Sequence, residues 1–149
     1  MNAASFLGMT EGFRERAEGV NALLADSRSA FVLVTSPRAD AVEDAGWFHH
    51  RLLDAGLPFA GVVANRVRAA APKGDPAAEL TELLGDEALA RRVTRTFEEE
   101  RRLAAQDRRN LAALRKLLGR KPMIEVPYLD DDVHDLAGLR RMDEYLFRS

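Results

Sequence analysis

Apolar residues occur along the chain in two patterns, as short continuous runs and as stripes with helical spacing. The runs lie at residues 30–35 (AFVLVT), 59–65 (FAGVVAN) and 123–126 (MIEV). Short valine-rich runs of this kind are typical of strands buried on both faces of a parallel sheet. Residues 30–65 therefore predict a strand, a helix and a second strand, which is the length of a right-handed βαβ unit.

Stripes of apolar residues at spacings of three and four predict the helices. The predicted helices span residues 10–25, 40–55, 76–84, 86–94, 95–118 and 136–146. Thr10 and Asp40 are placed to cap two of the helix starts, and Gly56 and Gly119 are placed to end two of them. We expect residues 1–9 to form a loose lead-in and residues 66–75, which contain Pro72 and Gly74, to form a loop.

These elements predict one α/β domain, with a partial parallel sheet of about three strands and helices on both faces. Three strands are few for such a sheet, and an edge strand presents unpaired backbone groups. We therefore expect the sheet to continue in another polypeptide segment or to pair with a second copy of the chain, which makes self-association an expectation.

Composition narrows the function. The chain has 149 residues, 22 basic and 24 acidic side chains and a formal charge of −2; this balance argues against a nucleic-acid-binding domain. The absence of cysteine excludes disulfides, thiolate metal sites and a cysteine nucleophile, and it fits a reducing cytoplasm, where we place the protein. No apolar run approaches the ~20 residues that span a bilayer, so we expect no direct membrane insertion.

The candidate chemistry lies where the predicted strands end, because ligands bind at the carboxyl ends of parallel strands. Asn65 ends the second run, and its carboxamide carries the donor and acceptor that pair with the N6/N7 edge of adenine. Pro127 and Tyr128 follow the third run and would supply an apolar wall for the base. The alternative is that Asn65 only ends a strand and opens a turn.

Other polar residues have plainer interpretations. Arg66 and Arg68 either approach a nucleotide phosphate or are exposed loop arginines. His49 and His50 are adjacent on a helix and point in different directions, so they are ordinary surface or packing histidines. The acidic stretch at residues 130–135 is most simply a solvated loop with acids near a helix N-terminus. We predict no metal site and no catalytic residue.

The stretch FVLVTSPRADAVEDAGWFHHRLLDAGLPFAGVVANRV resembles the later half of ArsA-type ATPases. This family includes arsenite-pump ATPases and the ATPases that target tail-anchored membrane proteins. The shared features are a strand ending in T-x-P, a helix with an acidic start at Val42-Glu43, and a strand ending in V-x-N-R-V. The segment VPYLDDDVHDLAGLRRMDEYL resembles the family's closing segment, so the resemblance covers residues 31–146.

The resemblance implies the C-terminal part of a P-loop-NTPase-like domain of the deviant Walker type, which binds and hydrolyses ATP with Mg²⁺ and works as a dimer. The adenine contact of the family falls on Asn65, and the base pocket after the V-P step falls on Pro127 and Tyr128. Arg66, which follows Asn65 directly, is the fourth candidate for nucleotide binding. A membrane protein as partner is implied by the resemblance only.

The chain departs from the family in one respect that decides its chemistry. Such ATPases hold the phosphates with a Gly-rich loop ending in Gly-Lys-Ser/Thr, whereas Lys73, Lys116 and Lys121 here follow Pro or Arg, and the switch segments are missing. We therefore expect the adenine-recognising C-terminal part of an ArsA-like ATPase, without hydrolysis or tight nucleotide binding on its own. The alternative is a non-catalytic interaction or dimerisation module that has lost nucleotide binding.

Overall fold

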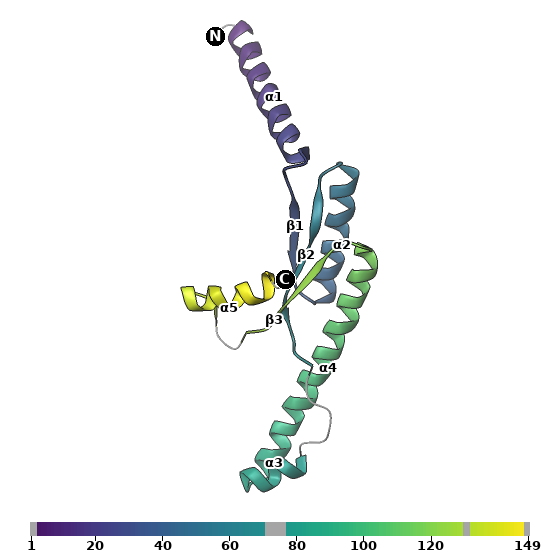
Figure 1. Cartoon of the computed structure of the whole chain (residues 1–149), viewed down its shortest axis with the longest axis vertical. Coiled ribbons are helices and arrows are strands. Elements are labelled where there is room, and N and C mark those ends of the chain that lie inside the picture. Colours follow the sequence, from purple (N-terminus) through teal and green to yellow (C-terminus); the bar gives the residue numbers. More distant parts are fainter. Residues whose placement is uncertain (1–2, 71–76, 130–131, 148–149) are drawn as a thin grey trace.

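The fold is α/β, and the computed structural model describes residues 3–70, 77–129 and 132–147. The elements in chain order are α1 (Ala3–Ala25), β1 (Phe31–Thr35), α2 (Ala39–Asp54), β2 (Phe59–Val67), α3 (Ala77–Leu84), α4 (Glu87–Leu118), β3 (Met123–Pro127) and α5 (Leu136–Leu146). Figure 1 shows the strands side by side at the centre and α1 running away from them. The predicted α/β class with a parallel sheet is confirmed.

The sheet has three strands in the order β1-β2-β3, and both pairings are parallel. The middle strand, β2, is therefore hydrogen-bonded on both sides. Close packing at its start depends on Gly61, because a Cβ at this position would lie 2.6 Å from the carbonyl oxygen of Pro122. A side chain there would force β3 away from β2, which is why the second apolar run needs a glycine in its interior.

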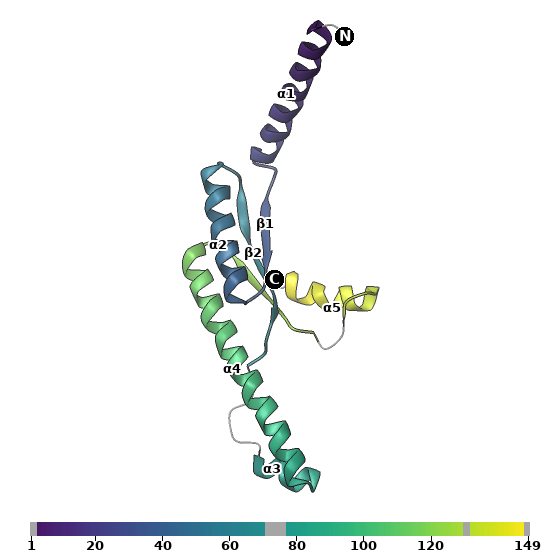
Figure 2. The ribbon, with the colours of Figure 1, turned by 180° about the vertical axis from the view of Figure 1, so that it is seen from behind.

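The core lies between the sheet and two helices, α2 and α4, which pack against each other and against the strands (Figure 2). The buried side chains that form it are Val42, Ala45, Leu52, Phe59, Val62, Leu114 and Leu118. Burial of these apolar groups is the main stabilising term for a domain of this size. The apolar spacing of residues 42, 45, 48 and 52 predicts that Phe48 lies on the buried face of α2, but Phe48 is exposed and the neighbouring His49 is buried in its place.

The other face of β1 is bare. Val32 is 53% exposed and Val34 is 70% exposed, whereas Phe31, Leu33 and Thr35 are half-buried. The prediction that this strand is buried on both faces, with helices covering both faces of the sheet, is therefore wrong for β1. A continuous apolar run indicates a strand, but whether the second face is covered depends on segments that lie elsewhere.

Two predicted helix boundaries are wrong. The helix expected from Thr10 begins at Ala3, so residues 3–9 of the predicted lead-in are helical, while residues 1–2 lie outside the described residues. The two helices expected at 86–94 and 95–118 form the single helix α4, because no Gly or Pro interrupts this stretch. Asp86 caps α4 and accepts hydrogen bonds from the backbone N–H groups of two residues in the first turn.

The prediction that Asp40 caps α2 is wrong. The N-cap is Arg38, and Asp40 lies in the first turn, where its carboxylate accepts from the Arg38 guanidinium (2.7 Å) and from the Ala41 backbone N–H (2.9 Å). The Arg38 hydrogen bond, followed by that of Ala41, lowers the pKa of Asp40 to about 2. Gly56 and Gly119 follow α2 and α4 with φ of 65° and 61°, which confirms their predicted role in ending these helices.

A buried histidine gives the core a pH-dependent component. His49 is 6% exposed, its ring centroid lies 4.6 Å from that of Phe59, and its Nδ1 has no hydrogen-bond partner among the residues that the structure describes. Burial lowers the pKa of His49 below its ordinary value of 6.5, with smaller contributions from the charges of His50 and Lys121. The imidazole is therefore neutral in the folded protein at neutral pH.

Unfolding exposes His49 and returns its pKa toward 6.5, so the unfolded state takes up a proton first as the pH falls. The free energy of unfolding should therefore decrease as the pH drops below 6.5, in a range where carboxylates are still ionised. Thermal unfolding of the wild type and of His49→Leu between pH 7.5 and 5 measures this. The fall should be reduced in His49→Leu, and parallel profiles for the two proteins would contradict the assignment.

Candidate functional site

A β-bulge places the first two candidate residues. Ala64 pairs with Glu125, and Val67 pairs with Pro127, so Asn65 and Arg66 of β2 both lie opposite a single residue of β3. Both residues belong to β2, and the loop predicted from residue 66 therefore begins after Val67. Bulges of this kind bend a strand and redirect its side chains, and they are frequent beside binding sites.

The four predicted residues line one cleft. The cleft has a volume of about 430 Å³, and its lining residues are Asn65, Arg66, Pro127, Tyr128, Leu129, Asp132, Val133 and Met142. They come from the bulge of β2, from the end of β3 and the segment after it, and from α5. The structure thus brings together side chains separated by more than half of the sequence. Because the strands are parallel, their carboxyl ends share one edge of the sheet.

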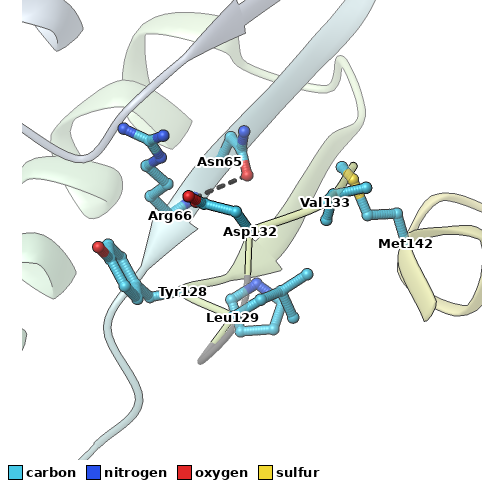
Figure 3. A pocket seen from close by; sticks show the side chains of 8 residues that line it. Asn65, Arg66, Tyr128, Leu129, Asp132, Val133 and Met142 are labelled. Carbon is cyan, nitrogen blue, oxygen red and sulfur yellow. Dashed lines mark hydrogen bonds between the residues drawn. The ribbon is translucent and has the colours of Figure 1, made fainter. Parts of the chain in front are cut away.

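The carboxamide of Asn65 is held by its neighbour. Its Oδ1 accepts a hydrogen bond of 2.9 Å from the backbone N–H of Arg66 (Figure 3). A carboxamide oxygen has two lone pairs, so one remains for a ligand. Within the described part of the chain, no hydrogen bond reaches Nδ2. The group therefore offers a donor and an acceptor side by side at the cleft.

The opposite side of the cleft comes from the end of β3. The backbone N–H of Tyr128 donates to the carbonyl of Val67 at 2.9 Å, so this segment stays tied to β2 beyond the strand. The Tyr128 side chain is 62% exposed and leaves an aromatic ring available for contact with a planar ligand. Leu129, Val133 and Met142 extend the apolar part of the lining.

Asp132 lines the cleft and carries an acidic group into it. Composition and spacing did not single it out from the acidic stretch 130–135, and nothing in the sequence indicated that Met142 of α5 lines the same cleft. Asp135 has a structural role, since its Oδ1 accepts from the Gly138 N–H at 2.6 Å and caps α5. Residues 130 and 131 of this stretch lie outside the described residues.

Arg68 is neither free to approach a nucleotide phosphate nor an exposed loop arginine. Its guanidinium forms an ion pair of 3.3 Å with the buried carboxylate of Asp107 on α4, and Glu100 lies 3.5 Å away. Its backbone N–H also donates to Asp107 at 3.2 Å. This contact ties the end of β2 to α4 and leaves the guanidinium of Arg68 committed to structure.

A second hollow of about 540 Å³ adjoins the first. It lies between the end of β1, the bulge and α2, and its lining residues are Leu33, Val34, Thr35, Ser36, Ala41, Asp44, Ala45, Phe48, Asn65 and Arg66. The hydroxyl of Thr35 donates to the carbonyl of Ala41 at 2.9 Å and joins the end of β1 to α2. Asn65 and Arg66 line both spaces, so the bulge is the boundary between them.

Comparison with models of known protein families finds no match, and comparison with curated protein sequences finds none either. The resemblance to ArsA-type ATPases, and with it the P-loop relationship, therefore stays a prediction. In the described ranges, no set of three His, Asp or Glu side chains is arranged to hold a metal ion. No helix there combines the length and apolar character needed to cross a bilayer.

Proposed function

We propose that the cleft at the β2 bulge binds the base of an adenine nucleotide, as the C-terminal part of an ArsA-like ATPase. The observation that carries the proposal is that Asn65, Pro127 and Tyr128 line one cleft. The sequence also predicts each of these three residues as part of an adenine site. The available donor and acceptor of the Asn65 side chain match the N6 and N7 atoms of adenine.

The rest of the lining suits a planar, mostly apolar ring with a polar edge. Pro127, Leu129 and the Tyr128 ring supply apolar and aromatic surface, and Asn65 supplies the directional contact. Sites for small molecules commonly combine these features, an apolar lining and a few fixed polar groups. Guanine presents an acceptor, O6, where adenine presents the N6 donor, so the oxygen of Asn65 favours adenine.

The nucleotide should bind weakly and should not be hydrolysed by this chain alone. No lysine follows a glycine in the sequence, so the loop that holds the phosphates and Mg²⁺ in such ATPases is missing. In the complete enzyme, ATP and Mg²⁺ would be held jointly with a P-loop half, and hydrolysis would be coupled to dimer closure. A membrane protein as its partner follows from the resemblance only.

Titration of the protein with ATP and ADP, with Asn65→Ala as the test variant, measures this proposal. A bidentate contact to a base is worth about 1–3 kcal/mol, so Asn65→Ala should weaken binding by about tenfold or more. Asn21→Ala is the matched control, because Asn21 is exposed on α1, away from the cleft. Equal affinity of wild type and Asn65→Ala would contradict adenine recognition by this residue.

A second candidate function is an interaction or dimerisation module without nucleotide binding. The observations that favour it are the exposed face of the edge strand β1, which carries Val32 and Val34, and the exposed apolar side chains of α1, which are Phe13, Val20 and Leu23. A second copy or a P-loop half would cover such surfaces. Self-association in sedimentation, without binding at millimolar nucleotide, would favour this function over the first.

A further inference from the structure

Arg66 has an unusual backbone conformation. Its φ is 61°, and among the described residues it is the only one other than glycine with a positive φ. A long side chain in this region of backbone conformation is strained relative to an ordinary conformation. The bulge and the hydrogen bond from its N–H to Asn65 hold it there. Strained conformations of this kind concentrate at ligand-binding positions.

The guanidinium of Arg66 has no ion-pair or hydrogen-bond partner within the described residues. Arg68, two positions along, is held by Asp107 and Glu100. The two arginines that flank Val67 therefore differ in kind: one is committed to α4, and the other is exposed at the boundary of two hollows. The Arg66 guanidinium therefore remains available to an anion.

The charged side chains around the two hollows determine where the phosphate of a bound nucleotide would lie. In Figure 3 the Arg66 side chain lies on the side of Asn65 away from Val133 and Met142. Asp132 lines the first hollow and Asp44 the second. A phosphate would be repelled by either carboxylate. It is favoured only near the guanidinium, between the two hollows.

We infer that Arg66 binds the phosphate nearest the nucleoside when the base lies between Asn65 and Tyr128, so that the site takes adenine nucleotides in preference to adenosine. This inference rests on the proposed function, because it needs the base in the cleft. A guanidinium forms charge-assisted hydrogen bonds with phosphate oxygens. That contact supplies phosphate recognition on a chain that has no Gly-Lys loop.

The test compares adenosine with AMP as ligands of the same protein. The wild type should bind AMP about tenfold more tightly than adenosine at low ionic strength, which is the effect of one charge-assisted contact, and salt should reduce the difference. Arg66→Gln should abolish the preference by weakening AMP binding toward the affinity for adenosine, while Arg66→Lys should keep part of it. Arg120→Gln, an exposed change before β3 at the other end of the sheet, is the matched control.

Asp44→Asn provides an independent readout, because the carboxylate of Asp44 lies in the hollow that Arg66 also lines. Its removal should strengthen AMP binding about twofold without changing adenosine binding. Equal affinities of the wild type for adenosine and AMP, or a preference retained in Arg66→Gln, would overturn this inference alone. If adenosine binding is the same in wild type and Asn65→Ala, the adenine proposal fails. If neither ligand binds at millimolar concentration, both fail.

Discussion

Leu114→Ala should be the most destabilising single truncation considered for this protein. Leu114 is fully buried, at 0% exposure, where α4 meets α2 and the sheet. Removing the branched end of Leu114 loses apolar burial and leaves a cavity among Val42, Leu52 and Val62. The cavity cannot collapse fully, because the surrounding side chains are closely packed. Leu→Ala changes at such positions cost about 2–5 kcal/mol.

Urea unfolding measures this loss as a lower midpoint with an unchanged slope. The matched control is Leu103→Ala, because Leu103 lies on the same helix and is 42% exposed. It makes the same chemical change without a buried cavity, so its cost should stay below about 1 kcal/mol. Similar midpoints for the two variants would show that α4 does not pack on the sheet through Leu114.

Asp107→Asn should have the second largest effect on stability. The carboxylate is 5% exposed and accepts both the backbone N–H and the guanidinium of Arg68. Removal of one partner of a buried pair costs about 3–5 kcal/mol when the other charge is left fully buried. The Arg68 side chain is 34% exposed, so water compensates part of the loss, and we expect about 2 kcal/mol.

Glu99→Gln is the control for this change, since Glu99 is an exposed acid of the same helix. It removes one negative charge from α4 without breaking the contact to β2, and it should change the free energy of unfolding by less than about 0.5 kcal/mol. A double-mutant cycle of Asp107→Asn with Arg68→Gln isolates the pairwise energy. A coupling near zero would mean that Asp107 stabilises the end of β2 through the backbone N–H alone.

Much of the candidate site could be predicted because it depends on topology. Once residues 59–65 and 123–126 are taken as parallel strands, their carboxyl ends must share one edge, and Asn65, Pro127 and Tyr128 follow. The bulge could not be predicted, since it is a mismatch in register between two strands. It is the bulge that gives Arg66 its positive φ and lets its N–H hold the Asn65 side chain.

The helices show the same difference between what the sequence predicts and what tertiary packing decides. A stripe predicts a helix, but its phase is uncertain by one residue, and the packing against Phe59 selects His49 over Phe48 for the interior. The break expected between residues 94 and 95 is absent, because local propensity there does not oppose a helix. The position of Met142 in the lining of the cleft depends on the path of α5.

The sequence by itself determined the order of strands and helices, the glycines that end α2 and α4, and the residue types at the strand ends. These features depend on hydrophobic periodicity and backbone freedom, which are local properties of the chain. The tertiary structure alone decided which strand faces stay bare, which arginine is neutralised by Asp107 and which is left at the cleft. Those outcomes depend on distances between segments far apart in the chain, and such distances arise only when α4 and α2 pack on the sheet.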